Sequence, residues 1–143
     1  MARLKRLARA LRSQRGVETI EAVITLPVAI LVLMAIVQYG LLMYSQQMCQ
    51  EAARHGVRMG VVAQENRVGV ALAEASGYGH TALPFAPLEV VPEAPGGVVG
   101  SVMRIRVTAQ VPNFIGPILA FFGFGSADPF TVNGTAEMRC EGW

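Results

Sequence analysis

The stretch RGVETIEAVITLPVAILVLMAIVQYGLL, residues 15–42, decides the fold class of this 143-residue chain. The run from Ala22 to Leu42 is uncharged, and its only polar side chains are Thr25 and Gln38. At a rise of about 1.5 Å per residue, a helix of this length spans roughly 30 Å, the thickness of the hydrocarbon core of a bilayer. The apolar region of a cleaved secretory signal is shorter, at about 7–15 residues. The sequence therefore predicts one membrane-spanning helix near the N-terminus.

The charges predict the orientation of this span. Six basic residues precede it: Arg3, Lys5, Arg6, Arg9, Arg12 and Arg15. Basic residues favour the cytoplasmic side, so we expect a cytoplasmic N-terminus in a bacterial inner membrane and an exported, periplasmic remainder. Every acidic residue lies after Gly16, where ten Asp+Glu face six Lys+Arg, a net charge of −4. The net charge of +2 on the whole chain is thus a topology signal and gives no indication of a nucleic-acid partner.

A glycine closes the basic leader, and a glutamate follows five positions later. Glu21 lies at the mouth of the span, where an unpaired carboxylate is costly and usually has a function. The arrangement resembles a type IV prepilin processing site, which implies that a prepilin peptidase cleaves after Gly16 and makes Val17 the new N-terminus. The alternative is an ordinary signal anchor with an acid at its edge.

The processing site suggests a physical mechanism. Cleavage would create a free α-amine on Val17, one helical turn before Glu21. In a medium of low dielectric constant the carboxylate would pair with this amine, in the same or an adjacent subunit, and so set the axial register. Pro27 has no backbone donor and leaves a carbonyl of the preceding turn unbonded, which favours a flexible or kinked span.

Helical character continues beyond the span as a stripe of small side chains. Its members recur at intervals of three and four residues: Ser45, Cys49, Ala52, Ala53, Gly56 and Gly60. Small residues let another backbone approach closely, so the stripe predicts helix packing. The partner is either the chain's own C-terminal domain or a neighbouring subunit.

The remainder predicts a small α+β domain. We expect a helix break at 64–66, a second helix over 68–75 that ends at 77–79, and a short strand at 88–91. Alternating apolar and polar residues over 102–111 and again over 130–140 predict two half-buried antiparallel strands packed on the long helix. The predicted inward faces are Met103, Ile105, Val107, Ala109 and Val111 in the first strand, and Phe130, Val132, Ala136, Met138 and Cys140 in the second. Three parts follow: a cytoplasmic leader (1–16), a transmembrane helix with a periplasmic extension (17–63) and a periplasmic α+β domain (64–143).

An apolar segment, residues 112–129, separates the two predicted strands. Gly116-Pro117 and Gly123 interrupt it, so it is too short and too broken to span a membrane. One interpretation is a lid that completes a small core, and the other is an exposed patch for a partner subunit or the membrane surface.

The two cysteines suit an oxidising compartment. Cys49 lies on the stripe of small residues, and Cys140 ends the last predicted strand on its apolar face. A disulfide between them would close a loop of about 90 residues and stabilise the domain by roughly 4–5 kcal/mol in the chain-entropy model. The alternative is a pair of buried free thiols.

The sequence contains no constellation typical of an enzyme. His55 and His80 are isolated, and no Cys, His, Asp or Glu residues have metal-ligand spacing. We therefore expect no catalytic residues, no metal and no cofactor, and interpret the chain as the substrate of a peptidase.

Further motifs narrow the resemblance to the TadE-like family, minor pseudopilins of tight-adherence (Flp-type) pilus systems. The residues that carry it are RGVETIEA (15–22), Leu26-Pro27, Gln38-Tyr39-Gly40, EAARHGVR (51–58) and the closing TAEMRCE (135–141). The family implies processing after Gly16, export, and partners among other pilins or pseudopilins and the inner-membrane platform of the pilus. Flp-type major pilins usually carry tyrosine after the glutamate; Ala22 in that place favours a minor component.

Two other functions fit the same sequence. An unprocessed, membrane-anchored binding or scaffold protein would retain residues 1–16. A pseudopilin of a general secretion system would be cleaved in the same way, but those proteins usually carry phenylalanine directly after the glycine, where this chain has Val17.

Overall fold

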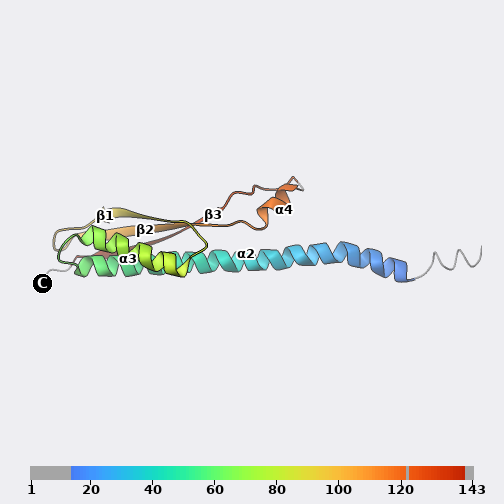
Figure 1. Ribbon diagram of the computed structural model, residues 1–143, viewed down its shortest axis with the longest axis horizontal. Coiled ribbons are helices and arrows are strands. Elements are labelled where there is room, and N and C mark those ends of the chain that lie inside the picture. The colour runs from blue at the N-terminus through green and yellow to red at the C-terminus, as the bar shows by residue number, and fades with distance from the viewer. Residues whose placement is uncertain (1–13, 122, 141–143) are drawn as a thin grey trace, which may run out of the picture. The chain divides into compact units, whose positions relative to one another are not determined.

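The computed structural model describes residues 14–121 and 123–140, and the chain divides into two compact units between Val37 and Gln38. Its elements are α2 (Gln14–Val62), α3 (Arg67–Ala82), β1 (Leu88–Pro95), β2 (Val102–Val111), α4 (Gly116–Phe121) and β3 (Phe130–Arg139) (Figure 1). The basic residues Arg3, Lys5, Arg6, Arg9 and Arg12 lie outside the described residues. The predicted fold class, a long apolar N-terminal helix with a small antiparallel sheet, is confirmed.

The first unit consists, in its described part, of the N-terminal half of α2. Among the described residues, α2 is the one helix long and apolar enough to cross a membrane. Large apolar side chains on all its sides are exposed, including Ile24, Leu33 and Ile36. A helix that is apolar all round requires an apolar surrounding, as a bilayer provides. The helix continues through Pro27.

The second unit begins within α2, at Gln38, and contains the rest of the chain. The predicted break lies at Asn66, which adopts a left-handed conformation and accepts a hydrogen bond from the Gly69 amide, capping α3. Our predicted end of this helix at 77–79 is wrong, because α3 continues to Ala82. Gly79 is buried there between Ala52 and Leu88, so this glycine provides close packing and does not end the helix.

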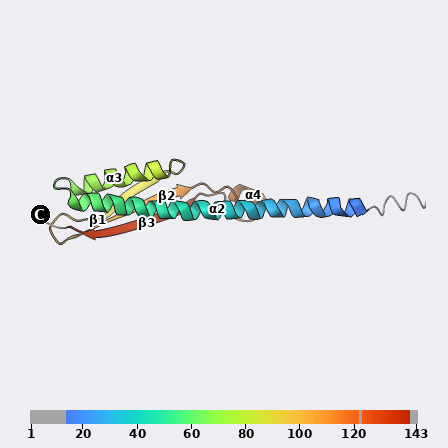
Figure 2. The ribbon, with the colours of Figure 1, turned by 90° about the horizontal axis from the view of Figure 1, so that it is seen from below.

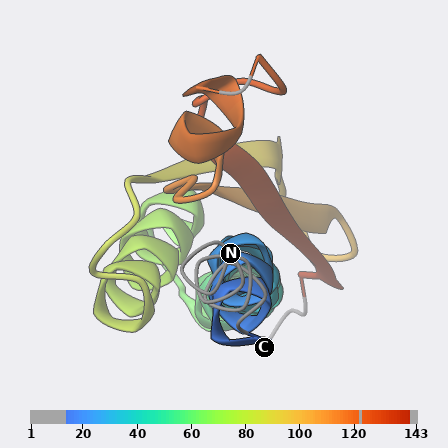
Figure 3. The same ribbon diagram turned by 90° about the vertical axis from the view of Figure 1, so that its right-hand side faces the viewer.

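The sheet has the order β1-β2-β3, with both pairs antiparallel. The sheet is covered on one face by α3 and the 38–62 part of α2 (Figures 2 and 3). The predicted inward face of β2 is confirmed, since all its members are almost fully buried: Met103, Ile105, Val107, Ala109 and Val111. β1 extends beyond its predicted end at Val91 to Pro95.

The predicted inward face of β3 is confirmed at Val132 and Ala136, which pack against the core, and at Cys140, which is buried. It is wrong at Phe130, which is 40% exposed, and at Met138, which is 37% exposed. The buried residue at the centre of the strand is Gly134. β3 is an edge strand, and its centre lies directly against the backbone of α2: a Cβ atom on Gly134 would stand 2.3 Å from the amide nitrogen of Gln50. This close approach leaves no room for a side chain at that point.

The stripe of small residues packs inside the second unit. Ala52 and Ala53 are fully buried. A Cβ on Gly56 would lie 2.6 Å from the Ala71 carbonyl oxygen, and one on Gly60 would lie 2.5 Å from the Ala71 Cβ. The chain's own α3 and sheet thus occupy this stripe, the first of the two partners considered.

The described residues of the apolar segment 112–129 form α4 and two flanking loops. Phe114 is 53% exposed and Phe124 is 69% exposed. The segment therefore presents an exposed apolar patch and is not a lid over the core.

Replacement of Gly134 by alanine should destabilise the second unit. The added methyl group meets backbone atoms that cannot rotate away, so we expect a loss of about 2–3 kcal/mol. Gly77→Ala is the matched control: it adds the same group on α3 with no atom within 4 Å, and should stabilise by about 0.5–1 kcal/mol. The rate of maleimide labelling of the buried Cys49 thiol in the full-length protein measures how often the second unit opens and exposes this residue. Equal labelling rates for the two variants would contradict the close packing of β3 on α2.

Candidate functional site

The predicted processing site lies on the first turns of α2. Gly16 and Val17 are within the helix, and Glu21 lies four residues after Val17, one turn further on. Glu21 is exposed among Ile20, Val23 and Ile24, which are also exposed. The chain has no other charged residue until Glu51. In a bilayer the Glu21 carboxylate would thus lie at the end of a long uncharged surface.

Gln38, which the sequence marks as polar and as part of a family motif but to which it assigns no contact, is the buried polar residue of the apolar run. Its side chain is 4% exposed. The amide nitrogen donates to the Pro112 carbonyl at 3.0 Å, and the amide oxygen accepts from the Phe114 amide at 2.9 Å. An amide side chain within an apolar run is costly unless both of its ends are bonded. The signal that could have identified Gln38 is therefore its place in that run.

Gln50 makes a second contact of the same kind. Its amide nitrogen donates to the Thr135 carbonyl at 2.6 Å, and its amide oxygen accepts from the Thr135 amide at 3.2 Å. Both backbone groups of Thr135 point away from β2, at the free edge of β3. Gln50 thus stands where a further strand would pair, and protects this part of the edge.

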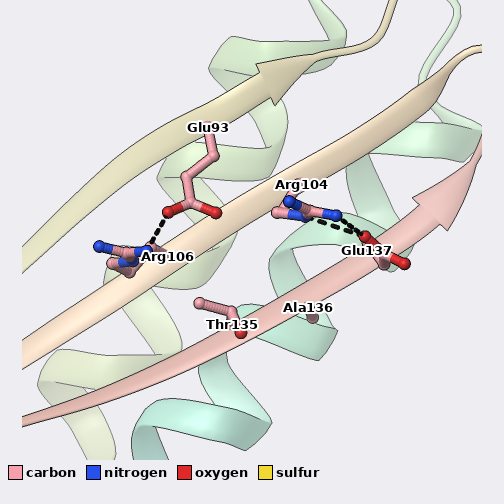
Figure 4. Close-up of a pocket in the computed structure, with 6 residues that line it drawn as sticks. All are labelled: Glu93, Arg104, Arg106, Thr135, Ala136 and Glu137. Carbon is pink, nitrogen blue, oxygen red and sulfur yellow. Dashed lines mark hydrogen bonds and ion pairs between the residues drawn. The ribbon is translucent and has the colours of Figure 1, made fainter.

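The outer face of the sheet carries a shallow hollow lined by charged residues (Figure 4). Arg104 donates to Glu137 at 2.8 Å, and Arg106 pairs with Glu93. The hydrogen bond with Glu137 raises the pKa of Arg104. Exposed pairs of this type are worth about 0–1 kcal/mol each, so this face is a solvated surface with paired charges.

The predicted disulfide is not formed: Cys49 and Cys140 are both buried free thiols. The reason is the register of β3 on α2. Gly134 lies against Cys49 and Gln50, and Cys140 follows six residues later, roughly 20 Å along an extended chain. A disulfide requires Cα atoms about 4.4–6.8 Å apart.

The two thiols have different surroundings. Burial raises the pKa of Cys49 to about 11. A backbone hydrogen bond with Gly97 is the main cause that lowers the pKa of Cys140, assisted by Ser101 and the charge of Arg67.

The predicted site residues thus fall into separate places. Gly16, Val17, Glu21 and Pro27 lie on the first unit, whereas the packing residues and both cysteines lie in the core of the second. His55 contacts Glu74 at 3.4 Å and stacks near Tyr78 on the surface. Within the described part of the chain, no three His, Cys, Asp or Glu residues are grouped in a way that could hold a metal ion.

The two glutamine contacts can be tested against each other. Gln38→Leu should accelerate hydrogen exchange at the Phe114 amide, and Gln50→Leu should accelerate it at the Thr135 amide. Each lost hydrogen bond is worth about 1 kcal/mol, so we expect an increase of about fivefold at the matched amide. Each variant is the control for the other, measured by mass spectrometry on the full-length protein in micelles. Acceleration at both amides in one variant would indicate general loosening and contradict separate local contacts.

The state of the cysteines predicts a simple chemical result. Alkylation of the denatured, membrane-extracted protein should modify two thiols per chain without prior reduction. A sample reduced before alkylation is the control and should give the same count. A count that rises from zero to two on reduction would show that the disulfide forms after all.

Comparison with known proteins agrees with the sequence motifs. Residues 16–58 match the family model described as TadE-like protein. No curated protein and no solved structure gave a significant match. The matched family is one of tight-adherence pilus systems, and one apolar helix is consistent with a single-pass membrane protein. The predicted resemblance is confirmed over residues 16–58, which match the TadE-like family model.

Proposed function

We propose that this chain is a minor pilin-like subunit, or an assembly factor, of a tight-adherence pilus and is cleaved after Gly16 by a prepilin peptidase. The observation that carries the proposal is the family match, which begins at Gly16 and includes Glu21. It supports a processing site at the position where the basic leader meets the apolar helix. The chain would then be the substrate of an enzyme and not itself one.

The structure supports different roles for the two halves of α2: one packs against the rest of the second unit, and the other exposes apolar side chains. Within the second unit, α3 and the sheet pack on residues 38–62 of α2, where the small residues are buried. The side chains from Ile20 to Val37 are mostly exposed. This part of α2 is therefore the surface through which the subunit would contact lipid and, after processing, the helices of other pilins or pseudopilins and the inner-membrane platform.

Glu21 would provide the specificity of that contact. Its carboxylate is exposed one turn from Val17, and the new α-amine would be the nearest source of positive charge on the chain. The pairing removes an isolated charge from an apolar surrounding, which favours processed subunits over unprocessed ones. The basic leader would hold the N-terminus in the cytoplasm until cleavage and leave the second unit in the periplasm.

The alternative is an unprocessed membrane anchor for a periplasmic binding or scaffold domain. The exposed apolar patch at 112–129 is the observation that favours it, because such a patch suits a partner. The intact mass and N-terminal sequence of the protein from native membranes separate the two. A start at Val17 supports processing, whereas retention of residues 1–16 supports the anchor.

Two substitutions test the separate roles of the processing residues. Gly16→Leu should block cleavage, so that the protein keeps its leader. Glu21→Gln should leave cleavage intact but reduce incorporation into isolated pili or pilus complexes by about tenfold, the effect of losing roughly 1.4 kcal/mol of pairing. Glu21→Asp, which retains the charge, is the control and should restore part of the incorporation. Normal processing and incorporation of Glu21→Gln would disprove the pairing.

A further inference from the structure

Two loops of the second unit are attached to α2 at the end of its apolar run. The amide of Gln38 binds the backbone of the segment 112–129 at both Pro112 and Phe114. The hydroxyl of Tyr44 donates to the Ala82 carbonyl at 3.2 Å, which places the 83–87 loop beside the next turns of the helix. These loops thus lie at the level of α2 where the apolar run ends.

The attachment point lies within the apolar run itself. Gln38 precedes Leu42, the last residue of the run, by four residues, which is about 6 Å along the helix axis. Tyr39 and Tyr44 are exposed on the same turns. Tyrosine is enriched at the boundary between hydrocarbon and headgroups. A loop bonded to Gln38 therefore starts at or below that boundary.

The surface of segment 112–129 suits this depth. Residues 112–127 contain no charged side chain, and Asp128, which is exposed, follows where the chain returns to β3. Phe114, Leu119 and Phe124 are exposed. Phe85 on the 83–87 loop is exposed as well. In Figure 1, α4 lies beyond the end of the sheet at which β2 ends and β3 begins.

The backbone of the segment is also suited to an apolar medium, in which unbonded polar groups are costly. The Leu119 amide donates to the Ile115 carbonyl at 3.0 Å, and the Phe124 amide donates to the Leu119 carbonyl at 2.8 Å. The side chain of Asn113 accepts from the Gly116 amide and donates to the carbonyls of Ser126 and Asp128, which ties the two ends of the segment together.

We infer that the segment 112–129, together with Phe85, inserts into the interfacial region of the bilayer beside α2. Lipid is favoured over a second copy of the chain as the occupant, because the segment is bonded to Gln38, which itself belongs to the uncharged apolar run of α2. The insertion would hold the exported domain against the membrane at a fixed depth. This inference rests on the membrane span and is independent of processing after Gly16.

Fluorescence quenching by lipid provides the test. In a Trp143→Phe background, Phe124→Trp gives a single tryptophan in the segment. The full-length protein is reconstituted in phosphatidylcholine vesicles whose acyl chains are brominated near the headgroup or near the bilayer centre. We expect a loss of fluorescence that is larger with shallow bromines than with deep ones.

Two further single-tryptophan variants are the controls. Val32→Trp lies in the apolar run and should be quenched most by deep bromines, which establishes insertion of the span. Val98→Trp lies on the β1–β2 turn, where Val98 is 75% exposed, and should not be quenched. The inference is overturned if Phe124→Trp behaves like Val98→Trp while Val32→Trp is quenched. It is also overturned if Phe124→Trp is shielded from bromines only at high protein density, because a second copy would then occupy the patch.

Discussion

The close approach of the α2 backbone to β3 is the constraint on which the second unit depends. Gly134 lets the strand rest on Cys49 and Gln50 without an intervening side chain. Once the strand is at that distance, the Gln50 side chain can bind both backbone groups of Thr135. The pairing of β3 with β2 then positions the inward face of β2 over the small residues of α2 and α3. A domain of this size has little apolar surface to bury, so close packing of backbone against backbone takes the place of large buried side chains.

Much of this arrangement could be predicted from periodicity. The inward face of β2 was readable because alternation over ten residues is a strong signal, and the stripe of small residues was readable from its helical spacing. The alternation in β3 also predicts its inward face, but it does not reveal the close contact at the centre, because the residue there is a glycine and contributes no apolar side chain. The end of α3 was mistaken for a related reason: Gly79 is required by packing against Ala52, and a single sequence does not distinguish that role from a helix stop.

The disulfide prediction failed because a pattern of buried residues does not fix the register of β3 on α2. Cys49 and Cys140 both belong to buried faces, and the structure confirms that both are buried. Which residue of β3 opposes Cys49 depends on the contact at Gly134, six residues before Cys140. The glutamine contacts escaped prediction because they join side chains to backbone groups about 75–85 residues away in the chain.

The two glutamines also explain how one helix can serve two surroundings. A polar residue within an apolar run normally marks a functional site or a polar contact with another helix. Gln38 instead directs both ends of its amide to a loop of its own chain, so the run remains compatible with lipid up to its last turn. Beyond that turn the small residues are covered by α3 and the sheet. In the apolar half of α2, Glu21 is an ionisable residue that the described contacts of the chain leave exposed. A subunit interface formed by this half must therefore either neutralise the Glu21 carboxylate or pair it with a positive charge.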